Sequence, residues 1–229
     1  MLDLSVIDYK DIYCTDESAA VQKDRYKSAI SEFTKAFEGT EPEAIFSAPG
    51  RTEVGGNHTD HQHGEVLAAS INKDAIAIVS KRSDDKVNVL AEGFGMTNIE
   101  LADLELREEE KGTTASLIRG VLAGLKDGGY TLGGFDAYIT SDVLIGAGLS
   151  SSAAFETLIG TVVSGLYNDM NIDPVEIAKT GQFAENIYFG KPCGLMGAAS
   201  RQQLCQIGPL SRAGALPSWR RTRLQPSRA

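Results

Sequence analysis

The sequence contains little cysteine and no long apolar run. Its three cysteines, Cys14, Cys193 and Cys205, are odd in number and far apart, which fits neither a disulfide framework nor a CxxC metal site. No stretch approaches the roughly 20 apolar residues that a membrane-spanning helix needs. The first residues, MLDLSVIDYKDIYC, lack the basic and apolar regions of a secretory signal. We therefore expect a cytoplasmic protein with reduced thiols.

Positive charge is scarce over most of the chain. The 22 Lys and Arg are outnumbered by 31 Asp and Glu, so the net charge is −9. This balance argues against a nucleic-acid or anionic membrane partner, because either would need a basic face. The balance reverses at the end: residues 197–229 contain six Arg, no Lys and no acidic residue, whereas residues 1–196 carry a net charge of −15.

The expected secondary structure mixes helices and strands without a regular alternation. A chain of 229 residues, 42% of them hydrophobic, forms one large domain or two small ones. Irregular mixing favours an α+β fold over a doubly wound sheet. Capping residues and apolar periodicity predict helices from Thr15 or Asp16 to Gly39, over 115–128, after Ser152 and from Asp173 to about 189, with strands at 44–49, 65–70, 75–81, 86–92 and 135–143.

All three histidines lie in one short stretch, GNHTDHQHG at 56–64. His58, His61 and His63, with Asp60 among them, have a spacing that lets a tight loop converge several ligands on one metal ion. The alternative is a polar turn without a metal. The stretch alone leaves both interpretations open.

A small-residue turn, GAGLSSSA at 146–153, lies between an expected strand and an apolar helix. Small residues let backbone N–H groups approach an anion, and a helix N-terminus favours negative charge. The turn is not a Walker loop, because no Lys-Ser or Lys-Thr pair follows the glycines, and it lacks the third glycine of a dinucleotide fingerprint. A serine-capped helix after a flexible turn is the alternative.

Three stretches together resemble one family. SAPGRTEVGGNHTDHQHGEVLAASIN resembles the substrate-binding signature of galactokinases, and GAGLSSSA resembles the phosphate loop of the wider GHMP kinase superfamily. FAENIYFGKPCGLM at 183–196 resembles the galactokinase segment that leads into a catalytic aspartate. The resemblance covers roughly residues 10 to 196, about the first half of a family member. It implies an α+β GHMP kinase N-terminal domain, ribosomal protein S5 domain 2-like, with a mixed β-sheet packed with helices and with the C-terminal GHMP domain missing.

The resemblance also implies an activity and its cofactors. The implied reaction is ATP-dependent phosphorylation of galactose, or a related hexose, to galactose 1-phosphate, with Mg2+. Arg51 matches an arginine beside the catalytic base. The residues that match sugar contacts are Asn57, His58, Asp60 and the backbone of Gly194. Those that match the Mg2+ ligands are Ser151 and Glu185, and those that match the phosphate loop are Gly146, Ala147, Gly148, Leu149, Ser150, Ser151 and Ser152.

The sequence departs from the family pattern at three positions. Asn57 replaces a glutamate and His61 replaces a tyrosine, so the exact sugar stays open. Gly197 stands where the family has the aspartate that acts as general base, and no resemblance remains after it. We therefore expect little or no activity. One alternative function is a catalytically inactive regulatory protein that binds galactose and ATP.

The change at Gly197 also sets the expected domain boundary. Residues 1–196 are the sugar- and ATP-binding domain, and residues 197–229 are a non-homologous, disordered basic tail. Our hypothesis is that a frameshift or a misjoined gene near Met196 produced this tail. A natural basic extension that contacts nucleic acid is the alternative.

Overall fold

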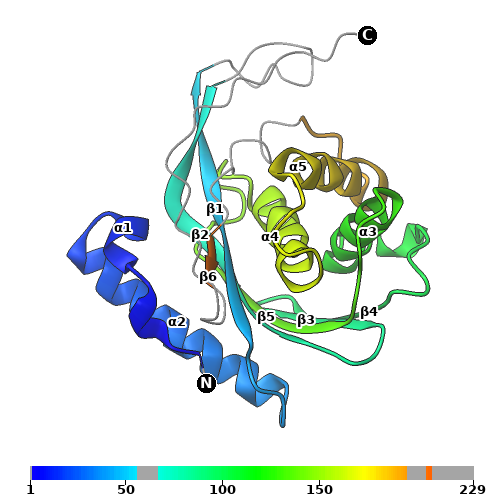
Figure 1. The fold of residues 1–229 in the computed structure, drawn as a ribbon. Coiled ribbons are helices and arrows are strands. Elements are labelled where there is room, and N and C mark those ends of the chain that lie inside the picture. Colours follow the sequence, from blue (N-terminus) through cyan, green and yellow to red (C-terminus); the bar gives the residue numbers. More distant parts are fainter. Residues whose placement is uncertain (1, 56–66, 195–204, 208–229) are drawn as a thin grey trace.

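The computed structural model describes residues 2–55, 67–194 and 205–207. Within these residues a mixed sheet of six strands has the order β4-β3-β5-β2-β1-β6 (Figure 1). Neighbouring strands are antiparallel except β3 and β5, which are parallel. The α+β prediction is confirmed. The strands are β1 (Ala44–Gly55), β2 (Leu67–Lys81), β3 (Lys86–Ala91), β4 (Gly95–Glu100), β5 (Phe135–Ser141) and β6 (Cys205–Ile207).

Helices cover both faces of the sheet (Figure 1). One face carries α1 (Tyr9–Tyr13) and α2 (Asp16–Ala36). The other carries α3 (Thr114–Asp127), α4 (Ser151–Tyr167) and α5 (Pro174–Phe183), which continues into a π-helical turn, η4 (Ala184–Phe189). Short 3-10 turns lie at Leu4–Val6 (η1) and Glu108–Glu110 (η3). Among the described helices, none combines the length and the apolar character that crossing a bilayer requires.

The apolar run of β2 explains why both faces are covered. Successive side chains of a strand point to opposite faces of the sheet. Ile76 and Ile78 pack with the cluster under α1 and α2, whereas Ala77 and Val79 pack with the cluster under α3 and α4. All four side chains are fully buried. A strand buried on both faces reads as a continuous apolar run, which is how this segment appears in the sequence.

Two helices begin where the capping residues predict. Thr15 Oγ1 accepts a hydrogen bond from the Ser18 backbone N–H at 3.1 Å at the start of α2. Asp173 Oδ1 accepts from the Val175 backbone N–H at 2.7 Å at the start of α5, and Pro174 follows the cap. A side-chain acceptor satisfies one of the N–H groups that a helix start leaves unpaired.

The strand prediction differs from the structure in β1, β2, β4 and β6. The expected strands at 65–70 and 75–81 form one strand, β2, over their described residues. β1 continues past Pro49 to Gly55 and pairs with both parts of β2, with a register shift between Pro49 and Arg51. β4 is not predicted at all. In the expected tail, Cys205–Ile207 pair with β1 as β6, and the rest of 197–229 lies outside the described residues.

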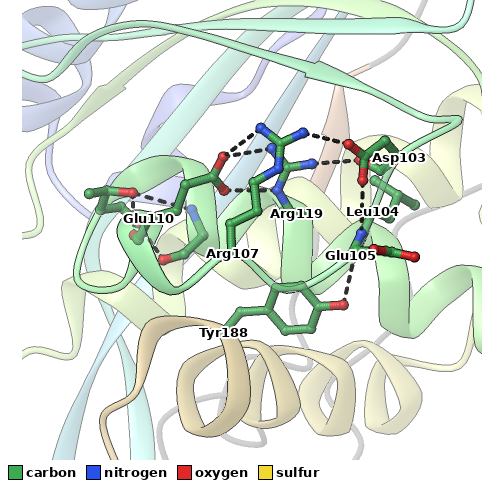
Figure 2. Close-up of polar contacts among 9 residues, drawn as sticks. Asp103, Leu104, Glu105, Arg107, Glu110, Arg119 and Tyr188 are labelled. Atoms are coloured by element: carbon green, nitrogen blue, oxygen red, sulfur yellow. Dashed lines mark hydrogen bonds and ion pairs between the residues drawn. The ribbon is translucent and has the colours of Figure 1, made fainter.

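The segment between β4 and α3 contacts both α3 and η4 (Figure 2). Arg119, buried in α3, donates to both carboxylate oxygens of Glu110 at 2.8 and 2.7 Å and also donates to the Asp103 carbonyl. The Tyr188 hydroxyl of η4 donates to the Leu104 carbonyl at 2.9 Å. Hydrogen bonds from α3 therefore fix this segment, and the segment accepts a hydrogen bond from η4.

Candidate active site

The turn before α4 has three residues in left-handed conformations. Their φ angles are +76° at Gly146, +72° at Gly148 and +54° at Ser150. Glycine adopts such angles without steric cost, and a serine adopts them at a small cost. Ser150 makes no side-chain cap on α4, in contrast to Thr15 on α2 and Asp173 on α5. A left-handed turn opening into a helix is a backbone geometry that suits an anion.

Ser152 and Glu185 connect this turn to η4. Ser152 Oγ donates a hydrogen bond to Glu185 Oε1 at 2.8 Å. Lys191 Nζ lies 3.3 Å from the same oxygen. The Glu185 side chain is only 5% exposed, whereas that of Lys191 is 64% exposed. A buried carboxylate needs such partners, because burying an unpaired charge is costly.

The π-helical turn sets the position of Glu185. α5 runs directly into η4, and such wide turns within helices occur frequently at functional sites. Gly120 of α3 lets η4 approach closely, since a Cβ atom there would lie 2.8 Å from Ala184 Cα. Gly190, at φ +81°, ends the turn, and the Lys191 backbone N–H donates to the Glu185 carbonyl at 3.0 Å. The chain reverses at Gly190, and Lys191 therefore lies against Glu185.

The segment after this reversal is tied to the same helix. The Cys193 backbone N–H donates to Asn186 Oδ1 at 2.7 Å, and Gln182 Nε2 donates to the Cys193 carbonyl at 3.1 Å. Gly194, the predicted sugar contact, follows directly. Burial and the nearby Glu185 carboxylate raise the pKa of the Cys193 thiol. Among the described cysteine side chains, Cys14 and Cys193 take part in no disulfide.

Arg51 reaches the small-residue turn from β1. Its side chain is buried, and Nη1 donates to the Gly148 carbonyl at 3.3 Å. Its backbone N–H donates to the Leu149 carbonyl at 3.4 Å. The register shift next to Arg51 lets β1 bend toward this loop, because a bulge re-aims the side chains that follow it.

The structure brings several predicted residues together and leaves others outside its described part. Arg51, the turn at 146–152, Glu185 and Gly194 come from four separate segments, and the first three are in contact through the bonds given above. The serine that reaches Glu185 is Ser152 rather than Ser151. The predicted residues outside the described residues are Asn57, His58, Asp60, His61, His63 and Gly197.

Sequence reasoning missed Lys191. A lysine between a glycine and a proline is typical of a solvent-exposed turn, and nothing in its spacing links it to Glu185 six positions earlier. Only the motif FAENIYFGKPCGLM, which contains both residues, offered a signal.

The fold and the small-residue turn at 146–152 define the class of protein. The model of the GHMP kinases N terminal domain matches residues 116–200. The crystal structure of Methanococcus jannaschii mevalonate kinase superposes with a TM-score of 0.59 at 19% identity, covering 75% of this chain and 55% of that chain. An identity this low speaks only to the fold. The described domain is a GHMP kinase N-terminal domain.

The family within this class follows from more specific matches. The galactokinase galactose-binding signature matches residues 31–81. Galactokinase from Clostridium tetani is 36% identical over 152 residues, which is 66% of this chain and 38% of the relative. Galactokinase from Pyrococcus furiosus is 39% identical over 149 residues, covering 65% of this chain and 41% of the relative. The chain belongs to the galactokinase family.

A solved galactokinase agrees with this assignment. The crystal structure of Lactococcus lactis galactokinase complexed with galactose has a TM-score of 0.71 at 29% identity, covering 77% of this chain and 46% of that chain. The chain spans less than half the length of the galactokinases described above.

Proposed function

We propose that this chain carries the sugar- and nucleotide-binding part of a galactokinase, an enzyme that phosphorylates galactose to galactose 1-phosphate with ATP. The observation that carries the proposal is the Ser152–Glu185 hydrogen bond, which joins a left-handed turn at a helix start to a buried carboxylate. Membership of the galactokinase family and the similarity to a galactokinase complexed with galactose support it. The free thiols of Cys14 and Cys193 support a cytoplasmic location.

ATP would bind over the turn at 146–152 and the first turn of α4. Gly146, Ala147, Gly148, Leu149, Ser150, Ser151 and Ser152 would present backbone N–H groups and hydroxyls to the phosphates. The chain has a net charge of −9, so an anionic nucleotide gains nothing from the overall field. The helix N-terminus and these local donors must therefore provide the attraction.

The residues at this turn fit Mg2+. In the part of the chain that the structure describes, no three His, Cys, Asp or Glu side chains gather into a metal site made of protein ligands alone. One carboxylate, Glu185, with the hydroxyls of Ser151 or Ser152 is a set of hard oxygen ligands. Mg2+ binds in this way, with few protein ligands, several waters and the phosphates of its nucleotide. When bound, Mg2+ neutralises charge on the phosphates during transfer.

The sugar would lie between Arg51 and the segment that ends at Gly194. Arg51, held against the Gly148 carbonyl, would stabilise charge on the transferring group. Asn57, His58 and Asp60 would hydrogen-bond the sugar hydroxyls, and the backbone at Gly194 would contact the ring. A carboxylate accepts from two hydroxyls at once, so Asp60 would contribute most. The substrate is galactose or a related hexose.

Gly197 reduces the expected turnover. It stands where the family resemblance puts the general base, and loss of a general base costs about 10² to 10⁴ in rate. We propose that residues 1–196 form the family domain, that residues 197–229 are unrelated to it, and that this chain turns over galactose slowly or not at all. The same substitution favours one second candidate, a regulatory protein that binds galactose and ATP without catalysis.

A paired experiment tests these proposals on the 229-residue chain. Calorimetric titration with galactose and with Mg–ATP measures binding, and a coupled assay with both measures phosphorylation. Binding of both ligands with turnover far below that of the relatives supports the proposal. Failure to bind either ligand would refute it, and turnover comparable with theirs would refute the role of Gly197.

A further inference from the structure

Lys191 provides a positive charge at the carboxylate that we assign to Mg2+. Its Nζ lies 3.3 Å from Glu185 Oε1, the same oxygen that accepts the hydrogen bond of Ser152 Oγ at 2.8 Å. The ammonium and the hydroxyl therefore share one oxygen. A divalent cation held by Glu185 would therefore compete with the Lys191 ammonium for this oxygen.

The carboxylate that Lys191 contacts is one of two buried acidic side chains in this part of the fold. Glu185 is almost completely buried, and so is Glu156, which is 1% exposed. Glu156 lies one helical turn after Ser152 in α4, so the two share a face. Glu156 Oε2 would lie 3.1 Å from a Cβ atom at Gly181. Gly181 belongs to α5 and lies about one turn before Glu185 of η4. Two buried carboxylates thus lie on neighbouring helical segments, and Lys191 contacts the one on η4.

The form of the Lys191 contact suits a temporary partner. The side chain of Lys191 is 64% exposed and makes a single contact with the carboxylate. Exposed lysine ion pairs are weak, and the ammonium is a point charge on a flexible stem. The lysine can therefore leave Glu185 without disturbing the buried side chains. Its backbone N–H stays bonded to the Glu185 carbonyl, so the ammonium remains tethered nearby.

We propose that Lys191 is a tethered counter-ion of the cation site, which releases Glu185 to a divalent cation and then pairs with the phosphates of the nucleotide. This proposal rests on the nucleotide site proposed above. A free divalent cation must displace the ammonium without giving it a new partner. A metal–nucleotide complex brings phosphate oxygens that accept the displaced ammonium. Lys191 thus makes the site favour the complex over the free metal ion.

We expect the substitution K191M to change the affinities for the free metal ion and for the metal–nucleotide complex in opposite directions. Removing the ammonium in K191M strengthens the binding of free Mn2+, a spectroscopic probe for Mg2+, by about two- to fivefold, as expected for loss of an exposed ion pair. The same substitution weakens the binding of Mn–ADP by about three- to tenfold, because a charge-assisted hydrogen bond to phosphate is lost. K191R keeps the charge and retains the preference for Mn–ADP.

Electron paramagnetic resonance of free Mn2+ measures both affinities on the 229-residue chain without requiring turnover. K179M is the matched control, because Lys179 lies on α5, pairs with the exposed Glu176 at 2.7 Å, and has no contact with Glu185 among the described residues. Thermal unfolding of both variants checks that the fold is intact. K179M should bind Mn2+ and Mn–ADP as the unaltered chain does.

The outcomes separate this proposal from the one on which it rests. If the unaltered chain binds neither Mn2+ nor Mn–ADP, the proposed nucleotide site is refuted and the role of Lys191 with it. If the unaltered chain binds both and K191M behaves like K179M, only the role of Lys191 is refuted. A K191M variant that changes both affinities in the same direction also refutes it, because Lys191 would then not discriminate the complex from the free ion.

Discussion

Ser152 of α4 donates a hydrogen bond to Glu185 of η4 at 2.8 Å, although the two residues are 33 positions apart. This bond crosses from the start of one helix to the π-helical end of another. It puts a buried carboxylate beside a turn whose left-handed residues suit an anion. The proposed nucleotide site depends on this arrangement.

Removing the charge of Glu185 should weaken nucleotide binding. In E185Q the amide keeps the shape of the side chain but loses the negative charge, so we expect affinity for Mn–ADP to fall about 10- to 100-fold, the range for an interaction with a charged group. E176Q is the matched control, since Glu176 is exposed on α5 and pairs only with Lys179 among the described residues. Equal affinities in E185Q and E176Q would contradict the assignment of Glu185.

Breaking the Arg119–Glu110 pair should destabilise the domain. Arg119 is 3% exposed, and E110A would leave its guanidinium buried, with the Asp103 carbonyl as its one remaining hydrogen-bond partner among the described residues (Figure 2). Such a loss costs about 3 to 5 kcal/mol, which urea unfolding measures. In E108A, by contrast, an exposed pair with Lys111 is lost, and the change should be below about 1 kcal/mol. Similar stability of the two variants would contradict the importance of this pair.

Buried tyrosines should make the domain sensitive to alkaline pH. Burial raises the pKa of Tyr9 to about 12 and raises the pKa of Tyr13 and Tyr26 as well. Above about pH 10 the unfolded chain loses these protons while the folded chain retains them, so the free energy of unfolding should fall as pH rises from 10 toward 12. Unfolding followed by circular dichroism between pH 8 and 11 measures this.

Tyr9 offers a direct check of that pH dependence. Among the described residues its hydroxyl is buried without a hydrogen-bond partner. Y9F should therefore stabilise the domain at pH 7 by about 1 kcal/mol, because the cost of desolvating the hydroxyl disappears. The same variant should also lose less stability above pH 10. A Y9F variant that is less stable at pH 7, with an unchanged alkaline slope, would contradict this account.

The close approach of α3 and η4 should not tolerate a larger residue at Gly120. A Cβ atom there would lie 2.8 Å from Ala184 Cα, which belongs to the backbone next to Glu185. G120A should destabilise the domain by about 1 to 3 kcal/mol through overpacking, despite the better helix propensity of alanine. Displacement of η4 should also weaken Mn–ADP binding. A G120A variant with unchanged stability and affinity would contradict the packing described here.

Local signals in the sequence predicted most helices and the central strands. Thr15 and Asp173 cap helices through bonds to residues two or three positions away, so a short window contains the whole signal. β4 was missed because it is an edge strand with a mostly polar sequence, GMTNIE, which carries little apolar alternation.

The joining of two expected strands into β2 depends on distant residues. Around Asp74 the sequence reads as a polar break between strands. In the structure Asp74 is buried, with Arg25 Nη1 at 2.7 Å and the Tyr13 hydroxyl at 2.8 Å. These partners lie 49 and 61 positions away, so no local pattern indicates that the carboxylate is satisfied inside the fold.

Local sequence indicates an anion-binding turn at 146–153, whereas the other site residues are predicted through the family resemblance. The resemblance identifies Arg51 and Glu185, and in the structure Arg51 Nη1 donates a hydrogen bond to the Gly148 carbonyl of the turn. The contact of Lys191 with Glu185 was not predicted, because it arises from the chain reversal at Gly190.

Calorimetric titration of Mg–ATP into the 229-residue chain and into E185Q tests the central claim most directly. We expect saturable binding at one site in the unaltered chain and an affinity at least about tenfold lower in E185Q. Absence of binding to the unaltered chain, or equal binding by the two proteins, would contradict the claim that the turn at 146–152 and Glu185 form a nucleotide site.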